Sequence, residues 1–297
     1  MSLNKRIQKP SWLRKRLPRG QAYENVRRML NNNLLHTVCQ EARCPNQWEC
    51  FSNKTAAFLI LGETCTRNCR FCAIKHGACK NPDLEEPKRV ANAAKWLGLD
   101  HVVVTSVTRD DILDGGASVF AMTISEIHNE MLDATVETLI PDFNGKEKSL
   151  LTVLDALPDV LNHNIETVPR LYHAVRPGAD YKRSLGILRS VNKHNSSIPT
   201  KSGLMLGLGE KRSEIKQTLE EIYQTGTTML TIGQYLQPSK ENLEVDRFVT
   251  PEEFDEWREI ALEIGFAEAF SGPFVRSSYN ARDMYRRYVR QKIEGEI

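Results

Sequence analysis

The sequence lacks any apolar run long enough to cross a bilayer, and its first residues show no secretory signal. It also lacks an excess of charge, because 40 Lys and Arg residues balance 38 Asp and Glu residues to a formal charge of +2. Such a balance gives no global field that would attract nucleic acid. No repeat of fixed period and no low-complexity linker is present, so one domain with terminal extensions is the simplest division of the chain. We therefore expect a globular protein that binds neither a membrane nor nucleic acid.

Cysteine is nearly absent outside one segment. The chain has seven cysteines, and all except Cys79 lie between Cys39 and Cys72. Crowded thiols without a secretory context favour metal binding over disulfides. We therefore predict a reducing compartment and a cytoplasmic protein, and we treat Cys79 as a spare thiol.

The six crowded cysteines form two triplets, spaced C-x4-C-x5-C and C-x3-C-x2-C: Cys39, Cys44 and Cys50, then Cys65, Cys69 and Cys72. A structural zinc site usually takes four protein ligands. Two sets of three instead suggest two iron–sulfur clusters, each with one position that no cysteine fills. Zinc remains the alternative, because His76 follows Cys72 by four residues and could complete a site.

From residue 55 onward the pattern alternates between short apolar or β-branched runs and amphipathic stretches. The predicted strands are residues 56–61, 101–106, 135–139, 160–164, 201–206 and 229–233. The predicted helices are residues 87–97, 117–130, 148–157, 181–193, 213–224 and 251–264. Six βα units joined by right-handed crossovers give parallel strands, but they cannot close an eight-stranded barrel. The expected fold class is therefore α/β, a partial (βα)6 TIM-like barrel.

The rest of the chain is predicted to flank this barrel. We divide the sequence into an N-terminal extension with the first cysteine triplet (1–54), the barrel (55–265) and a C-terminal extension (266–297). Residues 36–51 have no clean period, so we expect a loop held by metal. Seven cationic residues precede the first acidic residue, Glu24, and form a basic arm: Lys5, Arg6, Lys9, Arg14, Lys15, Arg16 and Arg19. Such an arm is usually a solvated tail, and a docking role is the alternative.

The second triplet follows the first predicted strand, at the edge of the sheet where barrel enzymes carry their chemistry. Three thiolates can hold three irons of a four-iron cluster and leave one iron exposed. The segment GETCTRNCRFC, with Phe71 before the last cysteine, resembles the radical S-adenosylmethionine superfamily. This resemblance implies that the open iron binds S-adenosylmethionine and that its cleavage gives a radical that abstracts hydrogen from an unactivated carbon.

A narrower resemblance rests on segments spread over residues 9–280. They are KPSWLR (9–14), LHTVCQEARCPNQWEC (35–50), TSVTRDD (105–111), DGGA (114–117), NHNIET (162–167), GQYLQP (233–238) and RSSY (276–279). Together these segments resemble the lipoyl synthase family. The resemblance implies a radical sulfurtransferase that inserts two sulfur atoms, at C6 and C8 of an octanoyl chain on a carrier-protein lysine. It also implies two [4Fe-4S] clusters, one of which is carried by the terminal extensions and supplies the sulfur.

The same resemblance assigns residues and partners. A serine of the RSSY motif is the fourth ligand of the auxiliary cluster, and we assign Ser277, with Ser278 or a simple turn cap as alternatives. The catalytic set is then Cys65, Cys69, Cys72 and Ser277. The implied partners are octanoylated lipoyl-carrier domains, of the E2 component of 2-oxoacid dehydrogenases or the H protein of glycine cleavage. An electron donor such as ferredoxin or flavodoxin is also implied, and we expect a monomer.

Polar side chains that follow predicted strands are candidates for the cofactor site, because they lie on the barrel rim. For S-adenosylmethionine we predict contacts from Asn162, Asn164, Glu166, Arg176, Gln234 and Tyr235, with ordinary loop roles as the alternative. Lys201 and Ser202 begin a strand, so they lie at the opposite rim and should be structural. Asp110, Asp111 and Asp114 precede a helix and are expected to cap it.

Two other functions stay open on sequence alone. One is a different sulfur-inserting radical enzyme of the same superfamily. The other is an iron–sulfur or zinc protein that only binds or transfers electrons. Electron transfer requires neither an open iron nor a large barrel with a polar rim, which favours the enzyme.

Overall fold

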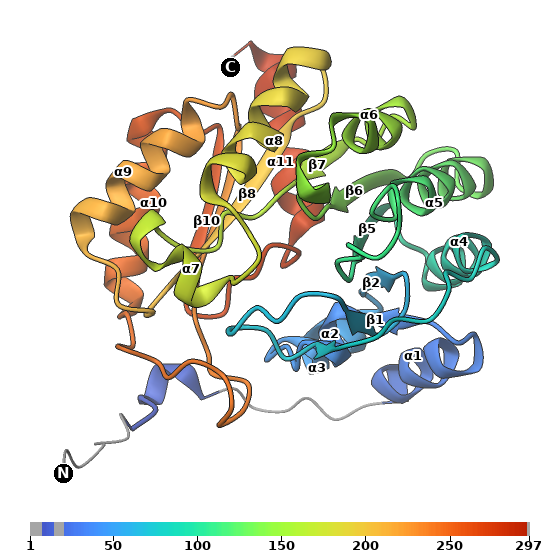
Figure 1. The fold of residues 1–297 in the computed structure, drawn as a ribbon, viewed down its shortest axis with the longest axis horizontal. Helices are drawn as coiled ribbons and strands as arrows, with labels where there is room; N and C mark the ends of the chain where they lie inside the picture. Colours follow the sequence, from blue (N-terminus) through green and yellow to red (C-terminus); the bar gives the residue numbers. More distant parts are fainter. Residues whose placement is uncertain (1–7, 15–20, 296–297) are drawn as a thin grey trace.

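The computed structural model describes residues 8–14 and 21–295 (Figure 1). Five residues of the predicted basic arm, Lys5, Arg6, Lys15, Arg16 and Arg19, lie outside the described residues. Among those described, no helix is both long enough and apolar enough to cross a membrane.

One eight-stranded sheet forms the centre of the molecule, in the order β1-β2-β5-β6-β7-β8-β9-β10. Neighbouring strands from β2 to β10 are parallel, and β1 pairs antiparallel with β2. The strands are β1 (His36–Thr37), β2 (Ala57–Ile60), β5 (His101–Ser106), β6 (Thr135–Leu139), β7 (Val160–Asn162), β8 (Thr200–Leu206), β9 (Met229–Gln234) and β10 (Glu268–Gly272). All six predicted strands are present, and the partial-barrel prediction is confirmed.

The helices surround this sheet, as Figure 1 shows. They are α1 (Gln21–Asn32), α2 (Val38–Glu41), α3 (Gln47–Ser52), α4 (Glu86–Leu97), α5 (Ala117–Glu130), α6 (Glu147–Asp155), α7 (Tyr172–Val175), α8 (Tyr181–His194), α9 (Arg212–Tyr223), α10 (Pro251–Ile264) and α11 (Ala281–Glu294). Every predicted helix is present within two residues of its expected ends. Helix α10 shows why: Thr250 accepts a hydrogen bond from the Glu253 amide, and Gly265 ends the helix at φ 119°.

Two elements of the predicted C-terminal extension belong to the barrel. Strand β10 pairs with β9 and adds a seventh parallel strand. Helix α11 packs Met284 and Tyr288 against Val160 and Met229, which begin β7 and β9, and so covers the N-terminal end of the barrel. The sequence boundary at residue 266 is therefore drawn too early. The β10 sequence, EAFSG, has no β-branched residue and gave no strand signal.

The expectation of a loop over residues 36–51 is wrong in part. This segment contains β1 and the short helices α2 and α3. The Thr37 hydroxyl accepts a hydrogen bond from the Gln40 amide at 3.3 Å and caps α2. Helix α1 covers α3 through Tyr23, whose ring stacks on Trp48 with the centroids 4.0 Å apart. Tertiary packing thus supplies the helical order that the local pattern did not predict.

A buried ion pair crosses the barrel interior between strands that are not neighbours. The Lys201 ammonium on β8 lies 3.0 Å from both carboxylate oxygens of Glu137 on β6. Both side chains are almost fully buried, at 0% and 1% exposure. The structural role predicted for Lys201 is therefore confirmed.

Candidate active site

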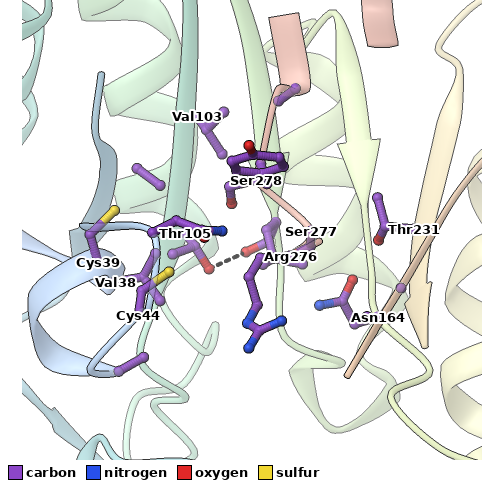
Figure 2. Close-up of a pocket in the computed structure, with 18 of the residues that line it drawn as sticks. Val38, Cys39, Cys44, Val103, Thr105, Asn164, Thr231, Arg276, Ser277 and Ser278 are labelled. Carbon is purple, nitrogen blue, oxygen red and sulfur yellow. Dashed lines mark hydrogen bonds between the residues drawn. The ribbon is translucent and has the colours of Figure 1, made fainter. Parts of the chain in front are cut away.

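One cavity of about 650 Å³ brings both cysteine triplets together with the C-terminal RSSY segment. It is lined by residues from the barrel strands and from both ends of the chain, including Cys39, Cys44, Cys50, Cys65, Cys69, Cys72, Ser277 and Ser278. Figure 2 shows Ser277 and Arg276 between Cys39 and Cys44 on one side and Asn164 and Thr231 on the other. Segments that lie far apart in the sequence therefore come together around one cavity in the folded chain.

The second triplet lies in a loop that leaves β2 at its C-terminal end. The chain turns there through Leu61 and Gly62, at φ 69° and 90°; glycine takes such a conformation without steric cost. The Arg70 amide donates to the Val175 carbonyl at 2.9 Å, and the Asn242 side chain donates to the Cys72 carbonyl at 2.8 Å. The loop is thus held by the backbone of distant segments.

The sulfurs of this triplet are placed as acceptors. Cys65 Sγ accepts the amide of Thr108 at 3.3 Å, and Cys72 Sγ accepts the amide of Ile74 at 3.5 Å. Burial, with the charges of Cys69 and Cys65 adding to it, raises the pKa of Cys72 to about 12. Such a thiol stays protonated at neutral pH unless a metal displaces the proton. Buried sulfurs that accept hydrogen bonds are the donor set that an iron–sulfur cluster needs.

The first triplet is built on α2 and α3. Cys39 lies in α2, Cys50 in α3, and Cys44 between them, where its amide donates to the Cys39 carbonyl at 3.0 Å. Burial raises the pKa of Cys39, and the neighbouring Cys44 and Cys50 sulfurs raise it further. The three thiols therefore lie close enough to interact electrostatically.

The C-terminal segment closes over the first triplet. The Asn46 side chain donates to the Phe274 carbonyl at 2.7 Å, across 228 positions of sequence. The Tyr279 hydroxyl donates to Glu49 at 2.8 Å. Gly233 at the end of β9 permits this closure, because a Cβ there would lie 2.2 Å from the Val275 carbonyl oxygen. The two ends of the chain thus meet at the cavity.

Ser277 and Ser278 are half-buried in the turn that follows β10 and line the cavity. Within the described residues neither hydroxyl caps the turn, in which the Tyr279 amide donates to the Arg276 carbonyl at 2.9 Å. Beside them, burial lowers the pKa of Arg276. The charges of Cys44 and Glu166 oppose this shift. The serine hydroxyls are therefore placed to bind a group in the cavity, and the choice between them stays a prediction.

Within residues 8–14 and 21–295, no group of three His, Cys, Asp or Glu side chains is arranged to hold a metal ion. A single zinc ion would draw its thiolates together at Zn–S distances of about 2.3 Å. In a four-iron cluster each thiolate binds a different iron, so the thiolates stand farther apart. The preference for clusters over the zinc alternative that includes His76 stays a prediction.

Three of the predicted cofactor contacts meet in the cavity after β7. The Asn164 amide donates to Glu166 at 3.0 Å, and Arg176 donates to the Asn164 carbonyl at 2.9 Å. Glu166 holds a left-handed φ of 71°, fixed on both sides by hydrogen bonds to β8; backbone strain of this kind concentrates at functional sites. Burial raises the pKa of Glu166, and Arg176 opposes that shift.

Two atoms of this group are buried without a hydrogen-bond partner in the described part of the chain: Asn164 Oδ1, an acceptor, and Arg176 Nε, a donor. Buried polar atoms normally find partners. S-adenosylmethionine offers both hydroxyl or ammonium donors and a carboxylate acceptor. The side chains of Asn164 and Arg176 therefore fit the cofactor.

Asn162 and Gln234, which the sequence predicts as contacts of S-adenosylmethionine, bind other parts of the protein instead. Asn162 does not line the cavity, and its amide donates to the buried Glu137 carboxylate at 3.0 Å; its role is structural. Gln234 lines the cavity, but its amide group binds the carbonyls of Leu206 and Arg247 and accepts from Val249. It braces the loop after β9 and does not present its amide to a ligand. The partners of both side chains come from distant parts of the barrel, so the local sequence does not predict them.

Tyr235 lines the cavity while its hydroxyl donates to the Leu243 carbonyl at 2.7 Å. Its ring contact with the cofactor stays a prediction. Cys79 is not among the residues that line the cavity, and its thiol donates to the Thr64 carbonyl at 3.0 Å, in line with a spare thiol. Arg67, inside the second triplet, is a buried arginine that binds two carboxylates and that no sequence pattern marks. Its partners lie 43 and 75 positions away, so no local signal marks it.

Comparison with known proteins agrees with this site. Residues 59–222 match the model of the radical SAM superfamily, and residues 2–44 match that of the N-terminal domain of lipoyl synthase. The lipoyl synthase of Desulfotalea psychrophila is 52% identical over 282 residues, which cover 95% of this chain and 94% of that protein. That of Caldicellulosiruptor saccharolyticus is 53% identical over 275 residues, covering 93% and 96%. The chain belongs to the lipoyl synthase family.

Solved structures support the fold of this lipoyl synthase family member. The crystal structure of methylornithine synthase matches with a TM-score of 0.53 and 15% identity, over 92% of each chain. Streptococcus suis SuiB bound to S-adenosylmethionine matches with a TM-score of 0.56 and 10% identity, over 83% of this chain and 54% of that one. At such identities the likeness shows the fold alone. Membership of the radical SAM superfamily itself implies a [4Fe-4S] cluster and S-adenosylmethionine as cofactors.

Proposed function

We propose that this protein is a lipoyl synthase, which inserts sulfur at C6 and C8 of an octanoyl chain on a carrier-protein lysine and so forms lipoyl-lysine. The observation that carries the proposal is that two cysteine triplets and an RSSY serine line one cavity. Cleavage of S-adenosylmethionine by itself needs only the cluster of the second triplet. The first triplet, with its own closing segment, provides for a second cluster that can serve as the sulfur source.

In this proposal the second triplet binds a cluster, and residues at the barrel rim bind S-adenosylmethionine. Cys65, Cys69 and Cys72 would hold a [4Fe-4S] cluster that, when bound, supplies the electron for cleavage of S-adenosylmethionine and hence the hydrogen-abstracting radical. Asn164 and Glu166 would orient the cofactor through its hydroxyl or ammonium groups, and Arg176 would bind its carboxylate. Because these groups are buried, they also exclude water from the reacting carbon.

Cys39, Cys44, Cys50 and Ser277 would hold the second [4Fe-4S] cluster. A serine alkoxide is a harder and more basic ligand than a thiolate and binds iron less well at neutral pH. Ser277 would therefore release its iron before any cysteine does, which frees the cluster to give up sulfur. Ser277→Cys should keep the iron content and abolish product, whereas Ser278→Cys is the matched comparison. Full activity of Ser277→Cys would contradict this role, and the reverse pattern would make Ser278 the ligand.

The carrier domain and the electron donor are proposed from the same function. We expect an octanoylated E2 or H-protein domain as substrate and a ferredoxin or flavodoxin as donor, in a monomeric enzyme of the cytoplasm. The basic arm can dock a carrier domain of acidic surface, since Lys9 and Arg14 are exposed. Neutralising Arg14, Lys15 and Arg16 should reduce turnover on the carrier domain more than on an octanoyl-lysine peptide. Equal losses on both substrates would rule out docking.

Anaerobic reconstitution followed by mass analysis tests the function as a whole. Two four-iron clusters predict about eight irons per chain. A carrier peptide bearing octanoyl-lysine should then gain the mass of two sulfur atoms with loss of the replaced hydrogens. Cofactor cleavage without sulfur on the peptide would point to a different substrate, and bound zinc with no cofactor cleavage would reject the radical enzyme.

A further inference from the structure

The loop that carries the second triplet is joined to the loop after β5 by its backbone. The Thr66 amide and hydroxyl both donate to the Thr108 carbonyl, at 3.0 and 2.9 Å. The Asp110 amide donates back to the Thr66 hydroxyl at 3.0 Å. These three hydrogen bonds join residues 64–67 to residues 108–110.

This junction directs two backbone amides at one sulfur. Cys65 Sγ accepts from Thr108 at 3.3 Å and from Arg67 at 3.4 Å. Within the described residues, Cys72 Sγ accepts one amide, that of Ile74, at 3.5 Å. Hydrogen bonds to cluster sulfurs are among the factors that set the reduction potential of an iron–sulfur cluster. Since the reduced cluster carries one more negative charge, each such donor favours reduction.

The Arg67 side chain fixes both amides. Its guanidinium forms a two-pronged bond to Asp110, at 2.7 and 3.0 Å, and donates to Asp142 and Asn144 at 2.7 Å each. The side chain is only 6% exposed. Asp142 also accepts from Arg183 of α8 at 2.8 Å. The network thus ties the cysteine loop to the loops after β5 and β6 and to α8.

We propose that Arg67 is a positioning residue that raises the reduction potential of the cluster on Cys65, Cys69 and Cys72 by holding the Thr108 and Arg67 amides against Cys65 Sγ. The proposal rests on the radical chemistry of the proposed function, but not on the identity of the substrate. Two parallel bonds in a fixed fork define the position of a guanidinium, which a lysine ammonium cannot reproduce. The effect of Arg67 on the reduction potential therefore depends on the geometry of its bonds to Asp110 as well as on its positive charge.

The test is a redox titration of the reconstituted protein, monitored by electron paramagnetic resonance, with neither S-adenosylmethionine nor peptide present. Cys39→Ala/Cys44→Ala/Cys50→Ala serves as the background, so that only the second triplet holds a cluster. Arg67→Gln and Arg67→Lys should each lower the reduction equilibrium constant about tenfold, a shift of roughly −59 mV for one electron. Arg212→Gln, which breaks the exposed pair of α9 with Glu256, is the matched control and should leave the potential unchanged.

Asp110→Asn separates positioning from simple charge and keeps the proposal testable where an Arg67 variant fails to load iron. Removal of a negative charge alone would raise the potential, whereas loss of the fork that positions Arg67 should lower it. An unchanged potential in Arg67→Gln, a wild-type potential in Arg67→Lys, or a raised potential in Asp110→Asn would each overturn the proposal. Failure of the proposed function would appear elsewhere, as a peptide that gains no sulfur in the wild-type protein.

Discussion

The buried pair of Glu137 and Lys201 is a point at which a single substitution should cost about 3–5 kcal/mol of unfolding free energy. Replacing Lys201 with Met leaves the Glu137 carboxylate in the barrel interior, with the Asn162 amide 3.0 Å and His101 Nε2 3.7 Å from it. Replacing Glu137 with Gln leaves the Lys201 ammonium without a counter-charge but keeps an acceptor for Asn162. The double variant removes both charges at once.

The magnitude follows from the geometry. At a separation of 3.0 Å, two unit charges attract by roughly 5 kcal/mol at an effective dielectric constant of about 20. Desolvation of both groups offsets much of that attraction in the native protein. Removing one partner gives up the attraction while the other group stays desolvated, so each single variant should lose about 3–5 kcal/mol of unfolding free energy. The double variant should lose far less than the sum, because no uncompensated charge remains.

Chemical denaturation of the iron-free protein under reducing conditions gives the four unfolding free energies of this cycle. A coupling of about 3 kcal/mol or more between positions 137 and 201 is expected, since the two groups act as one unit. Leu150→Ala, a buried residue outside the pair, provides an uncoupled control for each variant. Additive losses from Lys201→Met and Glu137→Gln would refute the reasoning, because they would mean that neither charge depends on the other.

Three further predictions use other parts of the site. Gly203→Ala places a Cβ 2.7 Å from Asn164 Oδ1. Binding of S-adenosylmethionine to the reconstituted protein should therefore weaken about tenfold, or about 1.4 kcal/mol. The control is Gly186→Ala in α8, whose Cβ meets nothing within 4 Å and which should leave that affinity unchanged. Gly233→Ala would push the Val275 carbonyl away, so iron analysis should fall from about eight to about four per chain; a full complement would show that the closing segment is not needed. Burial raises the pKa of Glu137 and of Asp142, but Lys201 and Arg67 outweigh it and hold each at about 2. These folded-state pKa values lie below the ordinary 4.5 and 3.8. The two carboxylates therefore stabilise the fold fully above about pH 4.5, and this stabilisation is lost as the pH falls toward 2. In acid denaturation, the stability of Glu137→Gln and of Asp142→Asn should depend less steeply on pH than that of the wild type.

The barrel was predictable because its strands and helices carry local signals. Residues 101–106 form a β-branched run, and Thr250 and Gly265 mark both ends of α10. Strand β10 and helix α11 lack such signals. Ala281, Met284 and Tyr288 are the buried residues of α11, and they lie within a sequence dense in charge. Their environment is the end of the barrel, which exists only in the folded chain.

The candidate site divides in the same way. The rim positions of Asn164 and Glu166 are predictable because polar residues after a barrel strand meet at its rim; their contact with the cofactor, like that of Arg176, stays a prediction. Asn162 has a similar sequence context, yet it still lies in β7 and its amide binds the buried Glu137 carboxylate, whereas Asn164 lies two residues beyond the end of the strand. Of the three aspartates expected to cap α5, only Asp114 binds the helix start, through the Gly116 and Ser118 amides. Asp110 and Asp111 pair with arginines instead, a choice that depends on tertiary placement.

The two triplets also differ in when they can form. Cys65, Cys69 and Cys72 lie within one short loop, so the order of a few residues brings them together. The first triplet is closed by contacts such as Asn46 to Phe274 and Tyr279 to Glu49, across 228 and 230 positions. Closing a loop of that length costs entropy that only the folded barrel between its ends repays. We therefore expect the first triplet to be closed only after β10 has joined the sheet, and a chain that ends before residue 274 to bind a cluster there through cysteines alone or not at all.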